Sequence, residues 1–227
     1  MITESLYIPN APVLPGLVFR HFQGESDYPQ MAAVIDASKV ADQIERTQSV
    51  AEIAHTYAHL TNCDPYQDML IADLNGEVVG YARAWWWQEQ NGPRLYGHLG
   101  FLKPAWRRKG IGRTMLHFLQ NRMRVVAASH PEGASPEGEL RRFFQGFAAD
   151  TEAGAEALLK NDGYTAVRYF FQMVRPALDD IPDAPVPDGL EVRPVQPEHY
   201  RAIWEADVEA FRDHWGYAPP TEEDYQA

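Results

Sequence analysis

The sequence is poor in three features that would each assign it to a particular class of protein: cysteine, basic charge and long apolar runs. Cys63 is the one cysteine among 227 residues, which excludes the internal disulfide framework of many small secreted proteins. Basic residues number 20 against 32 acidic ones, and the net charge of -12 repels the phosphate backbone of nucleic acids. Nowhere do about 18 apolar residues follow one another, as a membrane-spanning helix requires. We therefore expect a cytoplasmic protein that binds neither nucleic acid nor membrane.

The composition otherwise indicates a folded protein, and one stretch of it occurs twice. Hydrophobic residues make up 45% of the chain, which includes 11 tyrosines and 6 tryptophans. "APVLPGLVFR" at residues 11–20 is similar to "APVPDGLEVR" at residues 184–193, and a helical pattern follows each stretch. The repetition indicates either the beginning of a duplicated domain or two similar proline-rich segments that each lead into a strand.

The duplication predicts three parts. These are a domain at residues 1–175, an acidic proline-rich linker at 176–188 and a partial second copy at 189–227 with one strand plus helices. A piece as short as the second copy cannot bury a core of its own. We expect it to dock on the first domain, to swap between the chains of a homodimer, or to belong to a truncated longer protein.

Within the first domain the hydrophobic periodicity alternates between strand and helix. "DMLIADL" and "VVGYARAWWW" flank Asn75-Gly76, a pair typical of a hairpin turn. Gly163 lies where the last helix should stop. The order of the elements predicts a mixed α/β layered fold. Further expected strands are "LVFRHF" from Leu17, "LYGHLGFL" from Leu95, "RRFFQGFA" from Arg141 and "YTAVRYFFQMV" from Tyr164, and expected helices begin near Tyr28, Ser49, Arg113 and Thr151.

The motif "WRRKGIG" at residues 106–112 has the chemistry of a phosphate site. It places three cations directly before two glycines and ahead of an amphipathic helical run. A helix that begins at such a turn directs its free N–H groups and the positive end of its dipole at one point. Gly110 and Gly112 let oxygen atoms approach the backbone closely. The motif is neither a Walker loop nor a dinucleotide fingerprint, and on an acidic chain it favours the pyrophosphate of a small molecule.

The longer segment "FLKPAWRRKGIGRTML" resembles the acetyl-coenzyme A (acetyl-CoA) binding segment of the GCN5-related N-acetyltransferase (GNAT) superfamily. The likeness extends from Leu17 to about Val174, and the chain resembles the first half of a tandem member with a truncated second copy. The resemblance implies an α+β fold in which helices flank a mixed, mostly antiparallel sheet of six or seven strands. It also implies acetyl transfer from acetyl-CoA to a small primary amine, by direct attack and without a covalent enzyme intermediate. The cofactor-binding residues that it implies are Leu102, Lys103, Pro104, Arg107, Arg108, Lys109, Gly110, Ile111, Gly112, Arg113 and Thr114.

Direct attack needs one group that removes a proton from the amine and another that protonates the departing thiolate. His98 lies four residues before Leu102, a position similar to one where some family members carry a catalytic histidine, and an unperturbed histidine has a suitable pKa. Many relatives carry a tyrosine acid at the position of Leu159, which cannot donate a proton. Tyr164, Tyr169 or water then replaces it, and Tyr164 is our candidate. The alternatives are a structural histidine on a strand and a non-catalytic acyl-CoA-binding module that forms the regulatory or structural half of a tandem protein.

Two further groups of side chains have both a functional and an ordinary structural interpretation. His55 and His59 are four residues apart on a predicted helix, but no third ligand and no glutamate of a metalloprotease motif accompanies them, so we expect no metal site. The tryptophans at 85–87 fall in a strand, so alternate rings should face opposite sides of the sheet. They serve either as core or as an aromatic wall for an amine.

Overall fold

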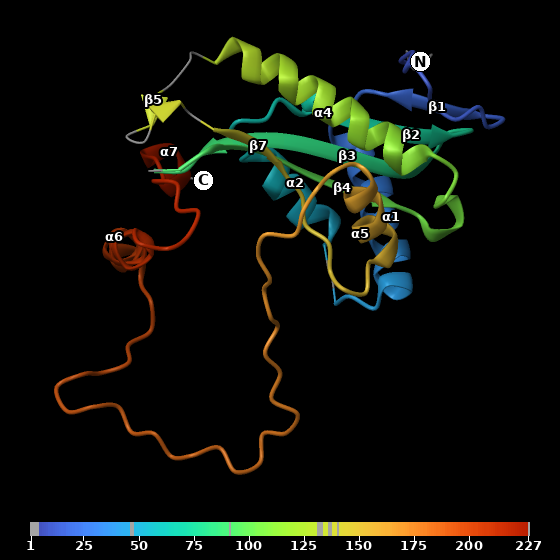
Figure 1. Cartoon of the computed structure of the whole chain (residues 1–227). Coiled ribbons are helices and arrows are strands. Elements are labelled where there is room, and N and C mark those ends of the chain that lie inside the picture. Colours follow the sequence, from blue (N-terminus) through green and yellow to red (C-terminus); the bar gives the residue numbers. More distant parts are fainter. Residues whose placement is uncertain are drawn as a thin grey trace. The chain divides into compact units, whose positions relative to one another are not determined.

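The computed structural model of the chain describes residues 5–45, 48–90, 92–130, 134–135, 138–139 and 141–226, and it divides into two compact units (Figure 1). The first unit is Met1–Tyr164 and the second is Thr165–Ala227. The division therefore falls directly after Tyr164, whereas the sequence predicted a first domain of residues 1–175. The linker and the partial second copy stay predictions.

A five-stranded sheet runs through the first unit in the order β1-β2-β3-β4-β7. Neighbouring strands are antiparallel except for β4 and β7, which are parallel. Two short strands, β5 and β6, pair with each other in a separate sheet. The bounds are β1 (Leu17–Arg20), β2 (Met69–Leu74), β3 (Glu77–Gln88), β4 (Arg94–Leu102), β5 (Ala134–Ser135), β6 (Gly138–Glu139) and β7 (Arg142–Gln145).

Helices cover both faces of the main sheet. Leu70 of β2 belongs to the buried cluster under α4, whereas its neighbour Ile71 belongs to the cluster under α1 and α2. This alternation follows from the two-residue period of a strand. The tryptophans of β3 obey it too, since Trp86 packs against the α4 cluster while Trp85 and Trp87 stack together, so the expected alternation is confirmed. The helices are α1 (Tyr28–Asp42), α2 (Val50–Ala58), α3 (Pro65–Asp68), α4 (Ile111–Ser129) and α5 (Ala153–Asn161), with 3-10 turns η1 (Glu25–Asp27) and η2 (Pro104–Trp106).

Two of the predicted turns are confirmed by their backbone angles. Asn75 and Gly76 have φ angles of 52° and 88° between β2 and β3, as a two-residue hairpin turn requires. The side chain of Asp73 accepts the N–H of Gly76 at 2.7 Å and fixes that turn. Gly163 has a φ angle of 86° just after α5, in the left-handed conformation that ends many helices.

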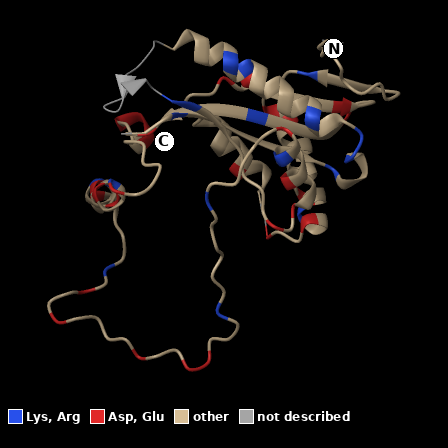
Figure 2. Cartoon of the chain, in the orientation of Figure 1, with Lys and Arg blue, Asp and Glu red and all other residues tan. Residues whose placement is uncertain are grey.

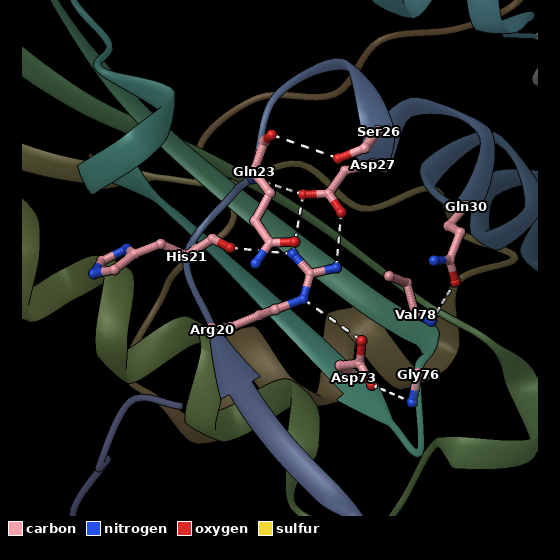
Figure 3. A network of polar contacts seen from close by, with 9 residues as sticks. All are labelled: Arg20, His21, Gln23, Ser26, Asp27, Gln30, Asp73, Gly76 and Val78. Carbon is pink, nitrogen blue, oxygen red and sulfur yellow. Dashed lines mark hydrogen bonds and ion pairs between the residues drawn. The ribbon is translucent and has the colours of Figure 1, made fainter. Parts of the chain in front are cut away.

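A buried ion pair joins β1 to the beginning of α1 (Figure 3). The guanidinium of Arg20 donates to Asp27 at 2.7 and 3.0 Å and lies 3.5 Å from Asp73 of β2. Asp27 also accepts the N–H of Gln23 at 2.8 Å. Removing one partner of a buried pair leaves the other charge uncompensated, at a cost of about 3–5 kcal/mol. The network therefore fixes the edge strand to both β2 and α1.

Among the described residues the main sheet has five strands, fewer than the six or seven expected from the resemblance. The strand predicted from Tyr164 to Val174 does not form. Phe171 and Met173 of this segment are 83% and 90% exposed. Alternating apolar residues supply a face for burial, but a strand also needs a neighbouring backbone to pair with, and this segment pairs with no described strand.

The second unit consists of the 3-10 turn η3 (Pro197–His199), α6 (Tyr200–Phe211) and α7 (Glu222–Gln226). Arg201 joins the two helices by hydrogen bonds of 2.7 and 2.9 Å to Glu222. Helix α6 has no buried residue, and the strand expected near Leu190 is absent from the described part of this unit. Over the described ranges of both units, no helix combines the length and apolarity needed to cross a bilayer.

Candidate functional site

The candidate site begins where β4 ends and α4 begins. Between them the backbone turns through Arg108 and Gly110, whose φ angles of 63° and 88° lie in the left-handed region. Gly110 precedes the 19-residue α4 and offers no side chain to cap it. The N–H groups of Ile111, Gly112 and Arg113 find no acceptor among the described residues. Free N–H groups at the positive end of a helix dipole form a site for an anion.

Positive side chains surround this helix start. Arg108 and Arg113 are exposed and make no hydrogen bond or ion pair with a described residue. Lys109 lies over the ring of Trp106, with Nζ 4.6 Å from the ring centroid. Helix α4 carries arginines and no acidic residue (Figure 2). The beginning of α4 therefore combines backbone donors with exposed cations.

The side chain of Arg107 is already bound to other residues of the protein. Its Nη1 and Nη2 donate to the carboxylate of Asp42 at 2.5 and 2.7 Å, and its Nε donates to the Leu102 carbonyl at 3.1 Å. The hydrogen bonds with Asp42 raise the pKa of Arg107. Because Asp42 is buried at the last position of α1, the pair fastens the loop to that helix.

Three other residues that the resemblance implied also serve the framework. The Lys103 ammonium donates to Glu77 at 2.6 Å, and Pro104 begins η2. The hydroxyl of Thr114 donates to the Gly110 carbonyl at 3.2 Å. The polar side chains of Lys103 and Thr114 thus already have partners in the protein, and a role of these residues in binding acetyl-CoA stays a prediction.

The parallel strands β4 and β7 separate beside His98. Their register runs from Arg94 opposite Arg142 to Gly97 opposite Gln145 and ends there. Gly146, the next residue, lies so close to His98 that a Cβ atom on it would be 2.8 Å from Cε1 of the imidazole. The His98 ring thus occupies the angle between the two diverging strands, and only a glycine fits opposite it.

The turn after α5 brings Tyr164 to the same place. The N–H of Tyr164 donates to the Leu159 carbonyl at 3.0 Å, across the left-handed Gly163. This is the hydrogen bond of a Schellman cap, and it fixes the direction in which Tyr164 leaves the helix. The Tyr164 hydroxyl lies 2.9 Å from Nε2 of His98. The structure therefore unites the two residues that the sequence proposed separately as base and acid.

A second layer of polar side chains supports this pair. Gln120 of α4 donates through Nε2 to the Tyr164 oxygen at 3.3 Å and also to Asp162. The imidazole of His117 lies 2.6 Å from the other Asp162 oxygen. The sequence analysis missed these three residues. One feature of the sequence could have revealed them: Gln120 is a polar residue on the apolar face of an amphipathic helix. In the structure it is 8% exposed.

Burial determines the protonation of both members of the pair. It lowers the pKa of His98 to about 4, although the charge of Asp162 acts in the opposite direction. It raises the pKa of Tyr164. Both groups are therefore neutral at pH 7. Gln120 donates to the Tyr164 oxygen, and the direction of the hydrogen bond between Tyr164 and Nε2 of His98 depends on which ring nitrogen of His98 carries the proton.

A family model and curated relatives both identify this chain as similar to acetyltransferases. The "Acetyltransferase (GNAT) family" matches residues 37–130, from within α1 to just past α4. A mycothiol acetyltransferase of Thermomonospora curvata is 30% identical over 203 residues, which are 88% of this chain and 60% of that protein. This chain belongs to the GNAT acetyltransferase family. Another GNAT relative, a mycothiol acetyltransferase of Salinispora arenicola, is 26% identical over 191 residues, and the chain spans 55% of its length.

Solved structures share the GNAT fold. A GCN5-related N-acetyltransferase from Sphaerobacter thermophilus superposes with a TM-score of 0.63 at 23% identity, over 94% of this chain and 63% of that one. A predicted acetyltransferase from Clostridium acetobutylicum with acetyl-CoA has a TM-score of 0.50 at 13% identity, over 70% of this chain and 96% of that one.

Acetyl-CoA is the cofactor of the GNAT family. The beginning of α4 fits its pyrophosphate, because free N–H groups and the unpaired Arg108 and Arg113 supply donors and positive charge. No group of three or more metal-ligating side chains occurs in the described ranges, and His55 and His59 contact each other at 4.5 Å between ring centroids on the exposed α2. The chemistry of the site is therefore that of anion binding beside a histidine and tyrosine pair.

Proposed function

We propose that this chain transfers an acetyl group from acetyl-CoA to a small primary amine by direct attack. The observation that carries the proposal is the 2.9 Å hydrogen bond between His98 and Tyr164 where β4 and β7 separate. The anion site at the beginning of α4 supports it, since β4 leads from one to the other within the first unit.

The chain would hold acetyl-CoA with the groups that have no protein partner. The first N–H groups of α4, with Arg108 and Arg113, bind the pyrophosphate. Beyond Gly97 no described strand pairs with the outer edge of β4, so its backbone before Leu102 can bond to the amides of the pantetheine arm. When bound, acetyl-CoA supplies an activated acetyl group as a thioester, whose sulfur leaves as a thiolate.

Tyr164 is the proton donor in this proposal. Burial raises its pKa, so Oη keeps its proton at neutral pH and can give it to the departing thiolate. The amide of Gln120, at 3.3 Å, stabilises the phenolate that remains. The attacking nitrogen becomes acidic once its bond to carbon forms, and its proton restores Tyr164. Tyr164 thus loses one proton and regains one, and no further group is needed to balance the reaction.

His98 positions Tyr164. A histidine whose pKa is about 4 does not remove a proton from a free ammonium at neutral pH, so the amine enters in its neutral form. With its proton on Nε2, His98 instead donates to the Tyr164 oxygen and holds the hydroxyl beside the end of β7, which leaves the hydroxyl hydrogen for the thiolate. This role replaces the base that the sequence suggested.

The test is turnover by the purified chain with acetyl-CoA and a panel of primary amines. Because curated relatives are named mycothiol acetyltransferases, the panel includes the amine that corresponds to mycothiol without its acetyl group. Thiol release together with an acetylated product of the correct mass is the expected result. Tight binding of acetyl-CoA without thiol release on any amine would contradict catalysis and support the alternative, a non-catalytic acyl-CoA-binding module, to which Leu159 at the usual tyrosine position points.

A further inference from the structure

Arg83 of β3 is a cation that lacks a partner among the described residues. Its Nε and Nη1 atoms are buried and make no hydrogen bond. Its guanidinium carbon lies 5.0 Å from the ring centroid of Tyr57 and 5.5 Å from that of Trp85. Aromatic rings attract a guanidinium, but they do not replace the acceptor oxygens that its N–H groups lose on burial. The residue as a whole has intermediate exposure, so part of its side chain is open to solvent.

The carboxylates around Arg83 are engaged elsewhere. Arg83 shares its surroundings with Asp27 near Tyr57, and with Asp64 and Asp68 near Cys63. The partners of these carboxylates are Arg20 for Asp27 at 2.7 Å, Arg122 for Asp68 at 2.7 Å and the Tyr66 N–H for Asp64 at 3.0 Å. Each of these three carboxylates thus has another partner, and no described carboxylate forms an ion pair with Arg83.

Arg83 lies close to the edge where we place acetyl transfer. In the register of β3 and β4 it is opposite Leu99, which directly follows His98. One residue along a strand is about 3.4 Å. Arg83 points to the face covered by α1 and α2, since it contacts Tyr57 of α2, whereas His98 points to the α4 face. No strand among the described residues pairs with β4 beyond Gly97 on its β7 side, and in the proposal a molecule held at Arg83 reaches the transfer point around the edge of β4 past Leu99.

Aromatic rings extend from Arg83 along the same face. Trp85 and Trp87 stack with centroids 6.1 Å apart and an angle of 19° between their planes. They cover Gly97 of β4, where a Cβ atom would lie 2.7 Å from Trp87 and 3.0 Å from Trp85. Gly97 is thus the residue that lets both rings lie flat on the sheet. The surface combines one unpaired guanidinium with a flat apolar wall.

We infer that Arg83 binds a carboxylate carried by the acceptor amine. The inference rests on the proposed acetyl transfer and adds the class of acceptor to it. A carboxylate offers two oxygens in the geometry of the guanidinium fork and would satisfy N–H groups that the protein leaves without acceptors. The carbon chain between carboxylate and amine lies along Trp85 and Trp87, which brings the amine toward the edge of β4 at His98.

The test compares ω-amino acids of increasing length with their primary amides as acceptors. For the length that fits, kcat/KM for the acid should exceed that for the amide by about 10- to 100-fold, the range expected for a charge-assisted pair of hydrogen bonds. Arg83→Met should remove this preference by raising KM for the acid. Arg83→Lys should retain part of it. Equal rates for acids and amides with the native chain would overturn the inference while leaving acetyl transfer intact.

A binding measurement separates this inference from the proposed function. Quenching of tryptophan fluorescence by the ω-amino acids, with coenzyme A present, reports binding at the Trp85 and Trp87 wall without any turnover. The acids should bind more tightly than the amides, and Arg83→Met should abolish the difference while Arg201→Met, a change in the second unit, should not. Preference for 2-aminoethyl phosphate over every carboxylate would overturn the assignment of a carboxylate. A large fall in the unfolding temperature of Arg83→Met would also overturn it, because the guanidinium would then serve the fold.

Discussion

Tyr164→Phe removes one oxygen atom from the centre of the proposed site and leaves the ring in place. The lost atom is the one that lies 2.9 Å from Nε2 of His98 and 3.3 Å from Nε2 of Gln120. If Tyr164 protonates the departing thiolate, kcat should fall by about 10²–10⁴-fold, the usual contribution of a positioned general acid. KM for acetyl-CoA should stay within a small factor, because the groups at the beginning of α4 are untouched.

The loss of stability is too small to imitate this effect. One net hydrogen bond is worth about 1 kcal/mol, and leaving His98 and Gln120 without their shared partner adds a cost of roughly 1–3 kcal/mol. A domain with a free energy of unfolding of about 5–15 kcal/mol stays folded after such a change. Urea unfolding of the variant therefore measures the structural cost separately from the rate.

The assay is continuous detection of the released thiol at saturating acetyl-CoA, for the native chain, Tyr164→Phe and the matched control Tyr169→Phe. Tyr169 is 74% exposed in the second unit, so its replacement should leave kcat unchanged. In the native chain kcat should decline only above pH 10, because burial raises the pKa of Tyr164 from that ordinary value. An unchanged kcat for Tyr164→Phe would refute the assignment of the proton donor.

Three further outcomes follow from the same contacts. Gly146→Ala should lower kcat about tenfold or more, with KM for acetyl-CoA retained, because the new Cβ displaces the His98 ring; steady-state kinetics with an unchanged kcat would contradict this. Asp42→Asn should lower the free energy of unfolding by about 1–3 kcal/mol and raise KM for acetyl-CoA, since the loop at Arg107 loses its anchor; thermal unfolding and kinetics that match the native chain would count against it. The free energy of unfolding should fall as the pH drops from 6.5 toward about 4, because the unfolded chain protonates His98 first. The loss is on the order of 3 kcal/mol, and parallel urea titrations of native chain and His98→Gln that show no difference in this window would disprove it.

The parts of the fold that the sequence predicted depend on neighbouring residues. Asn75-Gly76 and Gly163 adopt the left-handed conformations that a hairpin turn and a helix end require, and each needs only its own local chain. The turn and the first helical turn at "WRRKGIG" are likewise contiguous in sequence, and the phosphate site there stays a prediction. The two turn predictions hold because no distant partner decides them.

The parts that the sequence did not predict depend on residues far apart. Arg107 and Asp42 are separated by 65 positions, so the sequence could not show that this guanidinium is already bound to a carboxylate. His98 and Tyr164 are 66 positions apart, and burial, which no composition reveals, moves the pKa of His98 well below its ordinary value. The strand expected after Tyr164 is absent among the described residues for a related reason, because strand formation depends on a partner that lies elsewhere.

The division of the chain directly after Tyr164 has a consequence for how such a protein can change over generations. The hydroxyl that we assign to proton transfer belongs to the last residue of the first unit, so the whole proposed machinery is encoded before that point. A gene fusion, deletion or exchange that enters after Thr165 leaves every proposed catalytic contact encoded. One that enters two residues earlier, after Gly163, deletes Tyr164. Recombination at this boundary can therefore vary what accompanies the unit without rewriting its chemistry.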